Sequence, residues 1–182
     1  MKIACLGWGS LIWNPRELPI HTKWFDDGPY LPIEYTRQSL DGRMTLALTP
    51  GMDTIRSLWC LMKSATIEES LKALHQRECP KKNIYDGVAS WPDKEREGVI
   101  CYQIIDKWAK ELNIDAVIWT ILKPKFENNE GTTPTIEQVI DYLNALDGEK
   151  RAKAETYVRR TPIQIDTKYR RAVELHLGWL PI

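Results

Sequence analysis

The sequence has no excess charge of either sign, no long apolar run and no closely spaced pair of cysteines. Its 25 lysines and arginines balance 25 aspartates and glutamates. This balance argues against broad nucleic-acid binding, which needs a surplus of cations on one face. No run of about 18 apolar residues is present, so we expect no membrane-spanning segment. The first residues lack the pattern of a signal peptide, and we therefore expect a cytoplasmic protein.

Cysteine and histidine are too few and too scattered to predict a metal site. No CxxC pair is present, and in a reducing cytosol widely spaced cysteines are expected to be free thiols. The histidines show no zinc-ligand spacing. The residues concerned are Cys5, Cys60, Cys79 and Cys101, and His21, His75 and His176. The sequence therefore predicts no metal.

Strand patterns dominate the first third of the chain and helix patterns dominate the last third. Asp41-Gly42 between the expected strand segments 31–40 and 43–49 predicts a β-hairpin. Further strands are expected at 57–62 and 115–122, and the first of them is expected to be central in its sheet. This order predicts an α+β fold. The length suits a single domain over residues 1–182.

Capping signals predict where several helices begin. Thr66 with Glu69 three residues later forms a capping box, and the helix that it opens should run to about Cys79, where Pro80 ends it. A further helix is expected at 149–160, and the polar segment 123–131 is expected to be a loop. Three more helix starts are expected, at Ser90-Trp91-Pro92-Asp93, Thr133-Pro134 and Asp166.

The most informative feature is the turn that follows the first expected strand, Ile3–Leu6. Gly7 and Gly9 allow the backbone to turn sharply and to approach another group closely. A turn of this kind can point backbone N–H groups at a carboxylate or a carbonyl oxygen. It predicts an anion or oxyanion pocket, although a turn that only redirects the chain has the same signature.

Two better-known motifs do not fit this turn. A dinucleotide fingerprint needs a third glycine, but position 12 is Ile. The nucleophile elbow needs the pattern G-x-S-x-G, but Ser10 directly follows Gly9. Ser10 is therefore expected to hydrogen-bond to a substrate or to the turn itself.

A carboxylate occupies a core position near the end of the helix expected at 67–79. Its apolar row, with spacings of four, three and four residues, is Ile67, Leu71, Leu74 and then Glu78. Burial and the helix dipole both raise the pKa of a carboxyl group placed there, which suits general acid–base chemistry. Structural alternatives stay open: the helix frays before Pro80, or Glu78 pairs with Arg77, Arg37 or Arg43.

Three segments carry a family resemblance. Gly9-Ser10-Leu11-Ile12-Trp13-Asn14-Pro15 is similar to the signature loop of the γ-glutamylcyclotransferase-like family, especially its ChaC-type branch. Leu74-His75-Gln76-Arg77-Glu78 looks like the helix end that carries the family's catalytic acid, and 35–43 resembles its second hairpin. The resemblance covers about the first half of the chain. Trp8 stands where the family usually has tyrosine.

The resemblance implies a mixed, barrel-like β-sheet of about five strands with helices packed around it. It implies a reaction in which the α-amine of a small γ-glutamyl compound attacks its own γ-carbonyl, giving 5-oxoproline and a free amine without cofactor or metal. Glu78 would act as general base and then as acid. The residues expected to bind the substrate are Gly7, Trp8, Gly9, Ser10, Leu11, Arg37 and Arg43.

Glutathione, γ-glutamyl amino acids and γ-glutamyl amines all fit this substrate description. The alternative is a non-catalytic module on the same fold that binds a small molecule or a protein partner. Neither nucleic acid nor a membrane is expected as a partner.

Overall fold

The computed structural model describes all of residues 1–182 and has an α+β fold, as the order of the sequence patterns predicts. Two compact units can be distinguished. One consists of Met1–Gly7, Asn14–Leu31 and Arg56–Leu122, and the other of Trp8–Trp13, Pro32–Ile55 and Lys123–Ile182. A single domain over 1–182 stays a prediction. No helix combines the length and the apolar character that a bilayer crossing needs.

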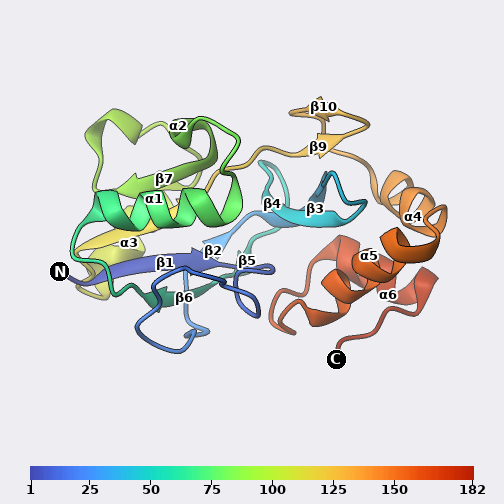
Figure 1. Cartoon of the computed structure of the whole chain (residues 1–182), viewed down its shortest axis with the longest axis horizontal. Helices are drawn as coiled ribbons and strands as arrows, with labels where there is room; N and C mark the ends of the chain where they lie inside the picture. Colours follow the sequence, from blue (N-terminus) through green and yellow to red (C-terminus); the bar gives the residue numbers. More distant parts are fainter. The chain divides into compact units, whose positions relative to one another are not determined.

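The first unit contains a mixed four-stranded sheet in the order β6-β1-β8-β7 (Figure 1). The strands β1 and β8 are parallel, and β6 and β7 run antiparallel to their neighbours. Their bounds are Ile3–Gly7 (β1), Leu58–Leu61 (β6), Val88–Trp91 (β7) and Ala116–Thr120 (β8). Every residue of β1 is buried, and so are the first four residues of β8.

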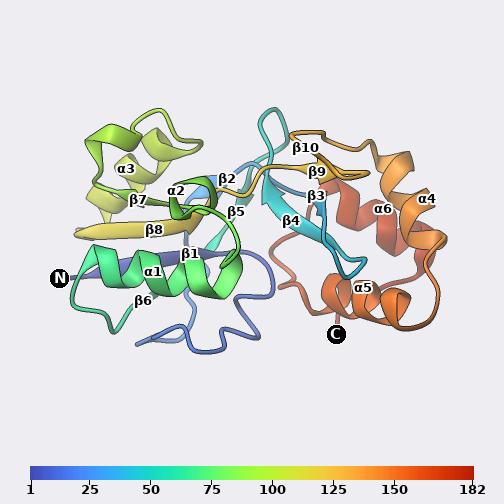
Figure 2. The ribbon, with the colours of Figure 1, turned by 45° about the horizontal axis from the view of Figure 1, so that its top comes forward.

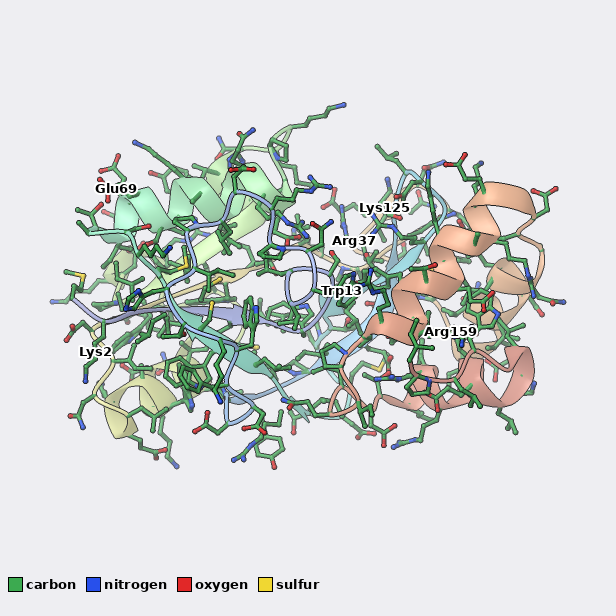
Figure 3. The ribbon with its side chains drawn as sticks, turned by 60° about the horizontal axis from the view of Figure 1, so that its bottom comes forward. Lys2, Trp13, Arg37, Glu69, Lys125 and Arg159 are labelled. Carbon is green, nitrogen blue, oxygen red and sulfur yellow. The ribbon has the colours of Figure 1, made fainter.

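Helices cover both faces of this sheet, which explains why its inner strands are apolar throughout. Helix α1 (Ile67–Glu78) packs on β8 and β7 from one side, and α3 (Tyr102–Glu111) packs on them from the other (Figures 2 and 3). Helix α2 (Ile84–Gly87) and a single 3-10 turn (Lys94–Arg96) flank β7.

Strand register assigns side chains to the two faces. Trp59 of β6 and Trp119 of β8 have ring contacts with Trp108 and Tyr102 of α3. Because successive side chains alternate between faces, their neighbours Cys60 and Ile118 face the other helix, α1. Cys5 of β1 lies opposite both Cys60 and Ile118 in the register, so the three side chains share the α1 face.

The expected barrel-like sheet of about five strands is not observed. The strands divide between two open four-stranded sheets and a short ribbon of β2 (Tyr30–Leu31) and β5 (Ile55–Arg56). The expectation that 57–62 is a central strand is also wrong, because β6 is an edge strand. At the outer edge, Trp59 of β6 forms an isolated bridge with loop residue Phe25, and Met62, the residue after β6, forms one with Ile20. No further strand pairs there, so the sheet does not continue.

The second unit contains a sheet in the order β10-β9-β3-β4 and three helices (Figure 2). Strands β3 and β4 form the hairpin predicted from Asp41-Gly42, with Gly42 at a φ of 91°. The element bounds are Ile33–Gln38 (β3), Met44–Leu48 (β4), Lys125–Phe126 (β9), Asn129–Glu130 (β10), Ile136–Asn144 (α4), Gly148–Arg160 (α5) and Lys168–Leu177 (α6).

The predicted start of α1 is confirmed. The Thr66 hydroxyl accepts a hydrogen bond from the Glu69 amide at 3.2 Å, and the Glu69 carboxylate accepts one from the Thr66 amide at 3.3 Å. Three other helix starts are displaced. Asp93 caps only the 3-10 turn, while α3 begins at Tyr102; α4 and α6 are capped by Thr135 and Thr167, one or two residues beyond the predicted positions.

The segment 123–131, expected to be a loop, contains the hairpin β9–β10. Glu127 and Asn128 at its tip both have a positive φ, 47° and 65°. Two successive residues of this kind form the tight turn that matches strand twist. The sequence lacks the usual Asn-Gly or Asp-Gly signal at this point, which is why the hairpin was not predicted.

Leu74 tests the packing of α1 on the first sheet. It is fully buried, whereas Leu71, one turn earlier, is only partly buried. We predict that Leu74→Ala lowers the free energy of unfolding by about 2–5 kcal/mol, because it leaves a cavity in an apolar interior. Leu71→Ala should cost less than half as much. Urea unfolding measures both, and equal costs would contradict the assigned helix face.

Candidate functional site

The residues predicted to form the site fall into both units. Glu78 and Gly7 belong to the first unit, Glu78 as the last residue of α1 and Gly7 as the last residue of β1. Gly7 is therefore paired in the sheet, opposite Leu58, rather than in the turn. The others, which are Trp8, Gly9, Ser10, Leu11, Arg37 and Arg43, belong to the second unit.

The turn Trp8–Trp13 packs against Tyr157 of α5. A Cβ atom added to Gly9 would lie 2.4 Å from the Tyr157 hydroxyl oxygen, a separation that packed atoms do not tolerate. The ring of Trp13 meets the ring of Tyr157 edge-on at 5.5 Å. Gly9 is thus required by a close approach, as its place in the sequence predicts.

Hydrogen bonding within the turn leaves donors available. The Ile12 amide donates to the Gly9 carbonyl at 3.0 Å, which closes the turn. The amides of Gly9 and Leu11 donate to no acceptor within the chain. Since Trp8 and Leu11 are each only 5% exposed, this part of the turn has little contact with water. An unpaired donor is costly there, and a bound oxygen atom would be favourable.

Tyr157 also connects the turn to the β3–β4 hairpin. Its hydroxyl oxygen accepts a hydrogen bond from the Leu46 amide at 3.3 Å. The rings of Tyr35 and Tyr157 are perpendicular at 6.2 Å, and the Arg43 guanidinium lies 5.3 Å from the Tyr157 ring centre. With these neighbours on several sides, Tyr157 has little freedom to move, so it fixes the position of the turn.

Arg43 is already engaged by a carboxylate. Its Nε atom donates to Asp41 at 2.9 Å, and Ser39 donates to the same carboxylate oxygen at 2.6 Å. Partial burial alone would raise the pKa of Asp41, but the hydrogen bonds from Arg43 and Ser39 outweigh it and hold that pKa below its ordinary value. Arg43 thus contacts Tyr157, the residue against which the turn packs, and one of its N–H groups is bound to Asp41.

Arg37 lies on the opposite face of the hairpin from Tyr35. The register pairs Tyr35 with Leu46 but Arg37 with Thr45, so a β-bulge at Thr36 interrupts the alternation. Arg37 donates to the Lys123 carbonyl and lies 3.7 Å from Glu130. The structure therefore brings Arg43, but not Arg37, to the face of the hairpin that Tyr35 and Tyr157 share.

In the first unit, Glu78 is held by Arg77. The Nη1 atom of Arg77 lies 3.1 Å from a carboxylate oxygen of Glu78, and the side chain of Glu78 is 20% exposed. Arg77 is itself fixed by the Asn14 carbonyl, to which it donates from Nε at 3.1 Å and from Nη2 at 2.7 Å. Of the structural alternatives, pairing with Arg77 is observed, and the helix stays intact up to Glu78.

The Cys5 thiol in β1 has a raised pKa, and Glu78 is one of its causes. A hydrogen bond to Cys60 and burial raise the pKa of the Cys5 thiol well above its ordinary value, and the nearby Cys60 and Glu78 add to this through electrostatic repulsion. The four cysteines form no disulfide.

Tyr157 is the structural residue that sequence reasoning missed. The spacing of Ala154, Tyr157 and Val158 in an otherwise polar segment was the available signal that Tyr157 is buried. These three are the buried residues of α5. No group of three or more histidine, cysteine, aspartate or glutamate side chains is arranged to hold a metal ion.

A double-mutant cycle tests the contact between the turn and Tyr157. We predict that Gly9→Ala lowers the free energy of unfolding by about 1–3 kcal/mol, because the added methyl group collides with the Tyr157 hydroxyl. In a Tyr157→Phe background, which lacks that hydroxyl, the same substitution should cost much less. Equal costs of Gly9→Ala in the two backgrounds, measured by urea unfolding, would show that the contact is absent.

Comparison with known proteins does not assign the chain to a family. No protein-family model matches it, and no curated protein sequence matches it. Membership of the γ-glutamylcyclotransferase-like family therefore stays a proposal.

Proposed function

We propose that the protein is a γ-glutamyl cyclotransferase of the γ-glutamylcyclotransferase-like family. It converts a small γ-glutamyl compound to 5-oxoproline and a free amine by intramolecular aminolysis. The same proposal includes the family's fold and a cytoplasmic location, which agrees with four cysteines that form no disulfide.

One observation carries the proposal: a mostly buried carboxylate is held at a fixed place by an arginine that is itself fixed. Glu78 is at the C-terminal end of α1, where the helix dipole disfavours negative charge. Helix stability does not call for a carboxylate in this position. The Arg77 side chain is only 7% exposed, and its two bonds to the Asn14 carbonyl keep its guanidinium in place beside Glu78.

The chemistry makes three demands that these residues could meet. An α-ammonium group with a pKa of about 8 must lose a proton before the amine attacks, and Glu78 is proposed to accept that proton. The tetrahedral intermediate carries an oxyanion, and each preorganised N–H donor can contribute about 3 kcal/mol to its stability. The uncommitted amides of Gly9 and Leu11 are proposed as these donors. Glu78 then returns the proton to the leaving amine.

Supporting roles follow from the contacts of each residue. Trp8 and Leu11 are buried and could keep water away from the reacting carbonyl, which favours cyclisation over hydrolysis. Arg43 has guanidinium N–H groups beyond the one bound to Asp41 and is proposed to bind the substrate's α-carboxylate. Arg37, committed to Glu130 and the Lys123 carbonyl, is the weaker candidate for this role.

A non-catalytic binding module is the second candidate. The observation in its favour is that both Glu78 and Arg43 already have ion-pair partners. In such a module Glu78 would serve to position Arg77, and the turn would hold a ligand without converting it.

Substitution of Glu78 distinguishes the two. We predict that Glu78→Gln lowers kcat for 5-oxoproline formation at least about 100-fold, because the amide can neither accept nor return the proton. The dissociation constant of the γ-glutamyl compound and the free energy of unfolding should change little. Chromatographic assay of 5-oxoproline, ligand titration and urea unfolding measure the three quantities.

Glu68→Gln is the matched control. Glu68 lies on the same helix, but it is exposed and paired with Lys72. This variant should keep wild-type turnover. Unchanged turnover in Glu78→Gln would remove the proposed role of Glu78, and a large loss of stability in that variant alone would assign Glu78 to the scaffold.

A further inference from the structure

The second unit contains a small cavity away from the turn and Tyr157. Its volume is about 140 Å³, and it lies where the β3–β4 hairpin, the β9–β10 hairpin, α4 and α5 meet. The side chains that matter for its chemistry are Gln38 and Leu40 from the first hairpin, Lys125 and Asn128 from the second, Tyr142 from α4 and Lys150 from α5. No residue that lines it carries a negative charge.

The two lysines of this cavity have no carboxylate partner, although acidic residues are near. Glu130 is opposite Lys125 in the β9–β10 register, but it lies 3.7 Å from Arg37. Glu149 precedes Lys150 in the chain, but it pairs with Lys153 at 2.6 Å. The hairpin's Asp41 is bound by Arg43 and Ser39. Because these nearby carboxylates are paired with other cations, the charges of Lys125 and Lys150 are not compensated.

Neutral hydrogen-bond donors accompany the lysines. The side-chain oxygen of Gln38 accepts a bond from the Glu127 amide at 2.9 Å, which fixes the orientation of the amide and leaves its NH₂ group as a donor. The Asn128 side chain has no partner within the chain. The Tyr142 hydroxyl donates to the Gly42 carbonyl at 2.9 Å, so its oxygen can still accept. The cavity therefore offers two cations and two amide donors.

We propose that this cavity is a binding site for a phosphate group, either inorganic phosphate or the phosphate of a small phosphomonoester. Lysines bind phosphate as compact point charges, and a dianion matches two of them. Amide NH₂ groups supply the remaining bonds to its oxygens. Leu40, which is 88% exposed at the rim, offers an apolar surface to an organic group attached to the phosphate. The proposal is independent of the proposed cyclisation.

The test is a titration of the full-length protein with sodium phosphate and, separately, with phenyl phosphate. Two-dimensional amide NMR at constant ionic strength set with chloride follows the binding. We expect saturable shifts confined to residues 38–42 and 125–128, to the part of α4 around Tyr142 and to the start of α5. Tighter binding of phenyl phosphate would identify a phosphomonoester as the ligand, and equal binding would identify free phosphate. Shifts that do not saturate, or that occur elsewhere, would overturn the proposal.

Variants that remove the same charge at different places distinguish phosphate binding in this cavity from nonspecific attraction to a cationic surface. Lys125→Met with Lys150→Met should weaken phosphate binding about tenfold or more, because both charge-assisted contacts are lost. The control pair Lys72→Met with Lys107→Met removes the same charge from exposed positions in the first unit and should leave the affinity unchanged. The pair Lys125→Arg with Lys150→Arg should retain binding. Equal affinity in the methionine pair and the control pair would refute the site.

Discussion

The two hydrogen bonds from Arg77 to the Asn14 carbonyl are the constraint on which the proposed chemistry depends. They fix the buried guanidinium of Arg77 next to Glu78, the last residue of α1. The ion pair with this guanidinium in turn holds the Glu78 carboxylate in place. A carboxylate at a helix C-terminus is otherwise disfavoured by the dipole and, in an apolar environment, by desolvation. An arginine held in this way gives the Glu78 carboxylate a fixed, positively charged partner at the end of the helix.

A second constraint, the approach of Tyr157 to Gly9, acts on the turn. The hydroxyl of Tyr157 occupies the space that a side chain at position 9 would need. The same ring contacts Trp13 and lies under the Arg43 guanidinium, so one buried tyrosine of α5 organises residues that are far apart in the sequence. Preorganised donors of this kind need no rearrangement when charge develops on a substrate.

Structural features that depend on neighbouring residues were predicted correctly from the sequence, and features that depend on distant partners were not. The capping box at Thr66, the Asp41-Gly42 turn and the apolar strand at β1 are determined by neighbouring residues, and all three are confirmed. The edge position of β6 depends on loop bridges, and the bulge at Thr36 that turns Arg37 away depends on register. The spacing of Ala154, Tyr157 and Val158 indicates that Tyr157 is buried, but nothing near it in the chain indicates that Gly9 is its neighbour.

The most direct test of the central claim is the product that the wild-type protein forms from γ-glutamyl compounds. Glutathione, γ-glutamyl amino acids and γ-glutamyl amines would be incubated with it, and 5-oxoproline, glutamate and the free amine would be quantified. The account predicts equimolar 5-oxoproline and free amine from at least one of them. Glutamate in place of 5-oxoproline, or no product from any compound, would contradict it.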